Sequence, residues 1–137
     1  MANSRQPKPK ADSEKITINL GFVDLGHIDL LVGEGFYSNR TDFIRTAIRN
    51  QLDRHGDTAR QSVARRQLVL GISRYDRAIL EKARATGEML DIKVLGLATI
   101  AADVSVHLAL ATIRSVTVLG ALHAGAEVKA ALADRIA

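Results

Sequence analysis

The chain has 137 residues, of which 47% are hydrophobic and 25% are charged, and its formal net charge is +4. These fractions are typical of a folded globular chain, and the length fits one domain or a small motif with an appendage. The absence of cysteine excludes disulfides, thiolate nucleophiles and cysteine-based metal sites, which suits a cytoplasmic protein.

The first segment, residues 1–14, is polar, contains both prolines and has no hydrophobic period. We expect a disordered basic arm there, carrying Arg5, Lys8 and Lys10. No apolar run follows these basic residues, so we expect no signal peptide. The longest uncharged stretch of the C-terminal half, residues 115–126, is shorter than the roughly 20 residues of a membrane-spanning helix, so we expect no membrane segment.

A short β-strand is predicted over residues 15–22. The apolar positions are Ile16, Ile18 and Leu20, and the polar positions between them are Lys15, Thr17 and Asn19. This period of two indicates one buried face. The next 45 residues contain no second strand, which leaves the backbone donors and acceptors of the first unpaired. The simplest partner is the same strand of a second copy, antiparallel about a two-fold axis, so the sequence predicts a homodimer.

Two helices are predicted after the strand. The first covers residues 24–34, and Gly35 ends it. Its apolar positions at helical spacing are Leu25, Ile28, Leu31 and Val32. Ser38 or Asn39 can cap the second helix, and Asp42 lies three residues after Asn39, as in a capping box. An apolar stripe then continues to Leu52.

The C-terminal part, residues 68–137, contains an internal repeat and follows a predicted polar linker over residues 54–67. The tripeptide Val-Leu-Gly occurs at 69–71, 94–96 and 118–120, spacings of 25 and 24 residues. Each unit opens with a β-like run and continues into a helix-compatible stretch. These stretches are residues 73–85, 103–113 and 127–136. Repeats of this length predict a short β/α module of about three stacked units. The alternative is a small α+β domain in which the recurrence of the tripeptide is partly due to chance.

A paired two-stranded ribbon has the dimensions to enter the major groove of B-DNA. If the apolar row of the predicted strand faces the core, Lys15, Thr17 and Asn19 face outward. Lysine donates to guanine or phosphate, asparagine can bond adenine with two hydrogen bonds, and threonine offers a hydroxyl and a methyl group. The alternative interpretation is an ordinary solvated strand face. The N-terminus of the second helix adds exposed backbone N–H groups with Ser38, Asn39 and Arg40, a combination that suits phosphate.

The sequence over residues 15–20, followed by a helix and by the pattern Ser-x-Arg-Thr-Asp-x-Ile-Arg at residues 38–45, resembles the ribbon-helix-helix fold of bacterial transcriptional repressors. The resemblance covers residues 14–52. It implies that the antiparallel ribbon of a dimer reads the major groove. Carried over by position, it implies base reading by Lys15, Thr17 and Asn19 and phosphate binding by Ser38, Asn39 and Arg40.

Enzymatic motifs are not found in the sequence. It contains neither a phosphate-binding loop of the P-loop type nor a Gly-x-Ser-x-Gly nucleophile turn. The four histidines form no close metal-ligand pair. They are His27, His55, His107 and His123. We therefore expect no enzyme activity, no cofactor and no metal site.

These observations predict an α+β chain with a ribbon-helix-helix domain over residues 15–53 and a C-terminal β/α repeat module over residues 68–137. The predicted function is that of a homodimeric, sequence-specific regulator of double-stranded DNA, a repressor, whose C-terminal module mediates assembly or receives a protein partner. Two alternatives stay open. One is an antitoxin that neutralises its toxin through the C-terminal half, and the other is a structural protein that self-assembles through the repeats.

Overall fold

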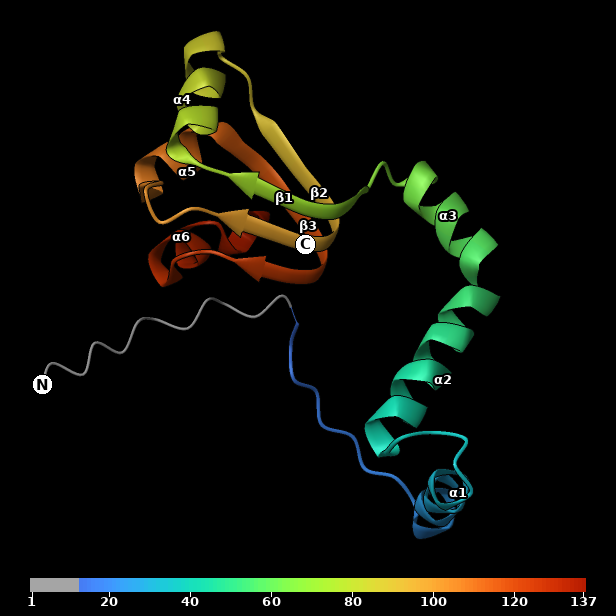
Figure 1. Ribbon diagram of the computed structural model, residues 1–137. Helices are drawn as coiled ribbons and strands as arrows, with labels where there is room; N and C mark the ends of the chain where they lie inside the picture. The colour runs from blue at the N-terminus through green and yellow to red at the C-terminus, as the bar shows by residue number, and fades with distance from the viewer. Residues whose placement is uncertain (1–12) are drawn as a thin grey trace, which may run out of the picture. The chain divides into compact units, whose positions relative to one another are not determined.

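The computed structural model describes residues 13–137 (Figure 1). The chain divides into two compact units, Met1–Asp53 (unit 1) and Arg54–Ala137 (unit 2), and each is described by itself. Most of the predicted basic arm, residues 1–12, lies outside the described residues.

Unit 1 contains two helices, α1 (Phe22–Gly33) and all but the last residue of α2 (Arg40–Arg54). Helix α1 begins two residues before the predicted start, after an N-cap at Gly21. Its C-terminal end is closed by Gly35, whose φ of +84° lets the Phe36 amide donate to the Leu31 carbonyl at 3.0 Å. This left-handed turn is favourable for glycine and directs the chain toward α2.

The strand predicted over residues 15–22 is not formed within the single chain. Residues 14–21 run as an extended trace that belongs to no sheet, and Phe22 is already part of α1 (Figure 1). A strand needs a hydrogen-bonded neighbour, and the three strands formed within residues 13–137 pair with one another instead.

Unit 2 is built around a three-stranded parallel sheet of order β1-β2-β3. The strands are β1 (Val69–Tyr75), β2 (Leu90–Ile100) and β3 (Ile113–His123). The helices are α3 (Gly56–Arg65), α4 (Arg77–Thr86), α5 (Val106–Thr112), α6 (Ala126–Ala131) and the 3-10 turn η1 (Ala133–Arg135). Helix α3 occupies the segment for which the sequence predicts a polar linker.

The sheet aligns the three Val-Leu-Gly tripeptides. Gly71 pairs with Gly96 and Gly96 pairs with Gly120, and the Val and Leu positions pair in the same register. The three glycines have φ values of +121°, +137° and +120°. A Cβ atom at Gly96 would lie 2.1 Å from the carbonyl oxygen of Gly71, and one at Gly120 would lie 2.1 Å from that of Gly96. Both the left-handed backbone and the close approach therefore require glycine in this column.

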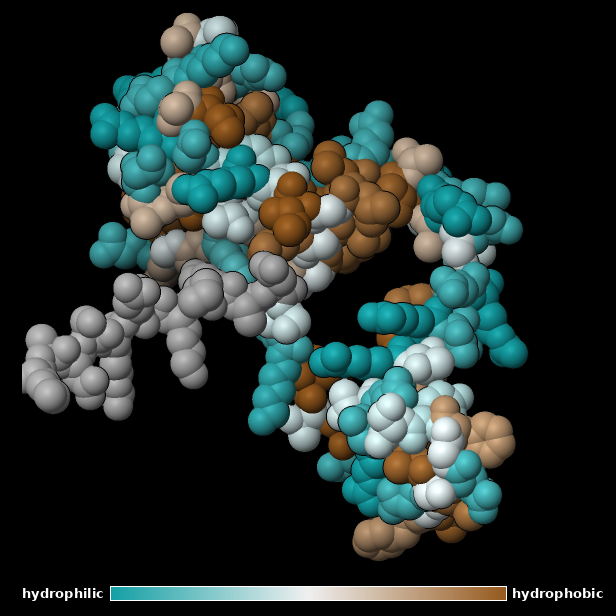
Figure 2. Space-filling model, in the orientation of Figure 1, coloured by the Kyte–Doolittle hydropathy of each residue, from teal (hydrophilic) through white to brown (hydrophobic). Residues whose placement is uncertain are grey.

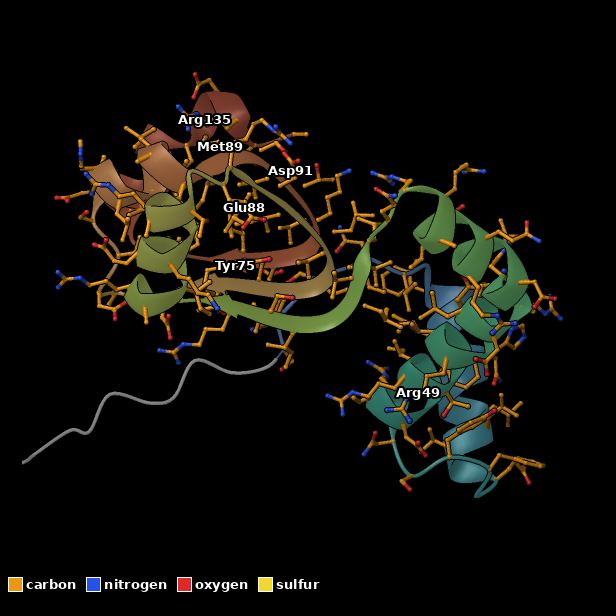
Figure 3. The ribbon with its side chains drawn as sticks, turned by 90° about the horizontal axis from the view of Figure 1, so that it is seen from above. Arg49, Tyr75, Glu88, Met89, Asp91 and Arg135 are labelled. Atoms are coloured by element: carbon orange, nitrogen blue, oxygen red, sulfur yellow. The ribbon has the colours of Figure 1, made fainter. Side chains whose placement is uncertain are left out.

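The core lies between one face of the sheet and the three helices that follow the strands. Helices α4, α5 and α6 run along the same side of the sheet (Figure 1). The largest fully buried side chains of unit 2 come from this layer. They are Leu80, Ile92, Val94, Thr112, Ile113, Val116 and Leu132. We call this side of the sheet the inner face. Tyr75, at the end of β1, packs against the same core (Figure 3).

Helices α4 and α5 start later than the sequence predicts, at Arg77 and Val106, whereas α6 starts one residue earlier, at Ala126. The delay of α4 follows from β1, which continues to Tyr75. Asp76 and Ser105 cap α4 and α5 by accepting hydrogen bonds from the backbone amides three residues ahead, at 2.9 and 3.1 Å. Asp103, which the sequence places at the start of its own helix, accepts instead from the amide of Arg77 at 3.1 Å. It therefore caps the neighbouring helix α4.

The C-terminal residues close one edge of the sheet. Arg135 (Figure 3) donates to the carbonyl oxygens of Leu110 and Ile113 at 2.8 and 2.7 Å, and the Ala137 amide donates to that of Val116 at 2.9 Å. The bonds to Ile113 and Val116 occupy carbonyl oxygens of β3, an edge strand of the sheet.

We expect Gly96→Ala to destabilise unit 2 more than Gly71→Ala. Both positions have positive φ, which costs a non-glycine residue about 1–3 kcal/mol. At Gly96 the new methyl group would also clash with a carbonyl oxygen 2.1 Å away, whereas a methyl group at Gly71 has nothing within 4 Å. Urea unfolding followed by circular dichroism measures the difference. Gly56→Ala, on α3, is the control, and equal losses for Gly71→Ala and Gly96→Ala would contradict the close-contact argument.

Candidate nucleic-acid interface

The segment with the predicted base-reading residues is fully accessible in the single chain. Lys15, Thr17 and Asn19 are exposed, and so are the apolar residues between them, with Ile16 74% and Ile18 57% exposed. The two rows of the period-two pattern are therefore both open to solvent in the single chain.

The start of α2 is fixed by its own side chains. Asn39 accepts a hydrogen bond from the Asp42 amide at 2.8 Å, and the Asp42 carboxylate accepts one from the Ser38 amide at 2.9 Å. The sequence predicted this type of reciprocal cap. It satisfies the amide of Asp42, whereas the amides of Arg40 and Thr41 have no acceptor within the helix. The rings of Tyr37 and Phe43 meet edge to face at 5.0 Å and hold the turn before α2 against the helix.

Arg40 forms an ion pair with Asp29, a residue that sequence reasoning missed. Its Nε and Nη2 atoms each donate to one carboxylate oxygen of Asp29 at 2.8 Å. The pair joins α1 to α2 across eleven positions, and more than half of each side chain is exposed. No local pattern in the sequence identifies Asp29, because the pairing depends on how the two helices cross.

The ion pair shifts the titration of both groups. Hydrogen bonds from Arg40 hold the pKa of Asp29 below its usual value, and those to Asp29 raise the pKa of Arg40. A carboxyl group whose pKa is lower in the folded state than in the unfolded state stabilises the fold above the unfolded pKa. That contribution disappears as the pH falls through the folded pKa.

Two of the six predicted site residues line the same surface pocket. Its lining consists of Ile18, Asn19, Leu20, Leu25, Arg40 and Ile44. Asn19 and Arg40 are thus brought together, whereas Lys15 and Thr17 lie outside this pocket. Ser38 and Asn39 are used in the helix cap, through a backbone amide and a side-chain oxygen.

The helix that follows this cap is basic on its surface. Arg40, Arg45 and Arg49 are all exposed along α2, and Figure 3 shows Arg49 extending from that helix. Exposed arginines that begin at the N-terminal end of one helix can contact an extended polyanion at several points.

Unit 1 has almost no core of its own. Among its described residues, 13–53, only Ile28 is buried. Large apolar side chains remain exposed on both helices, among them Phe22 at 93%, Leu30 and Leu52. This much apolar surface on so small a unit indicates that another surface covers it.

Residues 11–129 match the Ribbon-Helix-Helix transcriptional regulator family. The match therefore includes the sheet of unit 2 as well as the segment that resembled the fold in sequence. No curated protein and no solved structure matches the chain. Within residues 13–137, no helix is long and apolar enough to cross a membrane.

We expect the carboxyl group of Asp29 to titrate at a lower pH in the native protein than in Arg40→Gln. Removing the guanidinium removes the hydrogen bonds that favour the carboxylate, so the midpoint should rise toward the ordinary value of about 3.9. Carboxyl-detected NMR measures it directly. Arg45→Gln, which removes another exposed arginine of α2, should leave the midpoint unchanged, and an equal shift in both variants would contradict the specific pairing.

Proposed function

The chain belongs to the ribbon-helix-helix transcriptional regulator family, and from this premise we propose that it is a homodimeric repressor that binds a specific double-stranded DNA sequence. Family membership supports DNA binding and transcription regulation. The homodimer, the repressor role and the residues that contact DNA belong to the proposal.

The observation that carries the proposal is the unburied apolar row of residues 15–20. Ile16 and Ile18 are more than half exposed in the single chain, and Ile28 is the one buried residue among residues 13–53. Antiparallel pairing with a second copy gives the backbone of this segment its missing hydrogen bonds. It also gives the apolar row a common core with the helices of both copies.

The same pairing turns the polar row outward. With Ile16 and Ile18 directed toward the shared core, Lys15, Thr17 and Asn19 lie on the opposite face of the ribbon. That face fits the major groove, where donors and acceptors of the base edges differ for each base pair. We assign base reading to these three residues.

Phosphate binding is assigned to the start of α2, through Ser38, Asn39 and Arg40. The amides of the first helical turn are directed outward and carry the positive end of the helix dipole. Arg40 is paired with Asp29, but exposed pairs of this kind contribute little net free energy. A phosphate can therefore compete with Asp29 for the guanidinium. In the absence of DNA, Asp29 holds the guanidinium at the start of α2.

The direct test is a fluorescence-anisotropy titration with the DNA upstream of the protein's own gene and with a scrambled duplex, each at two salt concentrations. A specific regulator prefers its own site by about 10³-fold or more, and its affinity falls as salt rises. Absence of binding to either duplex at low salt would overturn the proposed function.

Asn19→Ala should relax the sequence preference and cost roughly 1–3 kcal/mol of binding free energy on the specific duplex only, because a bidentate amide contact distinguishes one base from another. The anisotropy titration with both duplexes measures it. Asn50→Ala, an exposed asparagine of α2, is the matched control. Equal losses on specific and scrambled DNA for Asn19→Ala would contradict the assignment of Asn19 to base reading.

Arg40→Ala should weaken binding to all duplexes alike and reduce the salt dependence, because a phosphate contact is independent of sequence. Asp29→Asn is the informative control. It also breaks the ion pair but keeps the guanidinium, so it should retain the affinity for DNA. If both substitutions weaken binding equally, Arg40 acts through the fold of unit 1 and not through phosphate.

A further inference from the structure

The sheet of unit 2 has a second face that helices α4, α5 and α6 do not cover. Along the strands, the positions that alternate with the core residues form two apolar rows. The rows are Leu70, Leu95 and Leu119, and Ile72, Leu97 and Ala121. We call these six residues the outer face. None of them belongs to the hydrophobic core, and Leu70 and Ile72 are 73% and 71% exposed.

An open apolar face is unusual for a parallel sheet. Because the connecting helices cover both faces in most such sheets, all-parallel sheets are buried on two sides. Here α4, α5 and α6 all contribute to the inner core. Within residues 54–137, only α3 approaches the outer face, where Val63, Leu70 and Leu95 line a common groove. Figure 2 shows hydrophobic side chains gathered over the strands beside the start of β1.

We propose that the outer face packs against the outer face of a second copy of the chain. The inference rests on the proposed function for the presence of that copy, since a dimer joined through unit 1 holds two copies of unit 2 together. Tethering of this kind raises the effective concentration of each copy of unit 2 for the other. The second copy is therefore the apolar partner that each outer face meets most often.

The outer face is complementary to itself. A two-fold axis that runs between the two sheets, parallel to β2, places β1 of each copy over β3 of the other. The large side chain of Ile72 then meets the small one of Ala121. Leu97 then lies near the axis and faces its equivalent. Two sheets packed in this aligned way lie about 10 Å apart, and large residues opposite small ones fill such a layer well.

Polar residues bound the outer face at both ends of the strands. Lys93 and Thr117 lie one row before it, and Thr99 and His123 lie one row after it. An apolar centre with a polar rim is the usual arrangement of a protein interface. The long Lys93 side chain can extend from the rim into solvent.

Cross-linking of the full-length protein tests the arrangement, and the absence of native cysteine makes an introduced thiol unambiguous. We expect Leu97→Cys to give a covalent dimer with a short bismaleimide at low protein concentration. Ile79→Cys is the matched control, because Ile79 is an exposed apolar residue of α4 in the same unit, and it should stay uncross-linked. If Leu97→Cys folds and sediments as a dimer but gives no cross-linked product, the proposal is overturned. In that case another surface covers the outer face, or the two copies meet at the β1 edge.

A second pair of variants does not depend on the reactivity of Leu97→Cys. Ile72→Glu, at an exposed position, should abolish the cross-link and lower the thermal midpoint of the dimer, whereas Ile79→Glu should do neither. The protein can also form a species larger than a dimer. If Ile72→Glu reduces this species to a dimer and Ile79→Glu does not, the outer face pairs with a copy that belongs to another dimer. Equal behaviour of Ile72→Glu and Ile79→Glu would overturn the proposal.

DNA titration of the same preparations separates this inference from the proposed function. Preferential binding to the protein's own site without a Leu97→Cys cross-link means that the regulator stands and the outer-face interface is wrong. A cross-link without sequence preference means that the interface stands and the proposed function is wrong.

Discussion

Every extended segment of a protein must find partners for its backbone N–H and C=O groups, and this requirement organises the two units differently. Unit 2 satisfies it within one chain, through the parallel sheet β1-β2-β3. Residues 15–20 of unit 1 have the strand pattern without a neighbouring strand among the described residues. The missing neighbour is the physical reason for expecting a second copy, and dimerisation, apolar burial and the outward polar row all depend on it.

The glycine column gives the sheet of unit 2 its register. Gly71, Gly96 and Gly120 share a left-handed backbone, and two of them face the preceding glycine's carbonyl at a distance that excludes a side chain. A one-residue slip would place a leucine side chain, or that of Ala121, against these carbonyls. It would also exchange the two faces of the sheet. The same register builds the inner core and aligns the apolar rows of the outer face.

Asp29 links the stability of unit 1 to its surface charge. Its ion pair with Arg40 connects α1 to α2 and neutralises a cation at the point where a helix terminus is most attractive to anions. Removing the aspartate frees that cation, whereas removing the arginine loses both roles. In the function that we propose, the contact of Arg40 with phosphate therefore competes with a contact that also joins the two helices.

The sequence predicted interactions between residues close together in the chain, but it did not predict contacts between distant elements. The cap at Asn39 follows from residues near one another, and the alignment of Val-Leu-Gly in the sheet follows from the 25- and 24-residue spacing of the tripeptide. The family could also be recognised from residues 14–52. The Asp29–Arg40 pair, the capping of α4 by Asp103 and the open outer face depend on how separate elements meet. Sequence period fixes which side of an element is apolar, but only the tertiary structure decides what that side contacts, because burial is a property of the neighbours and not of the residue.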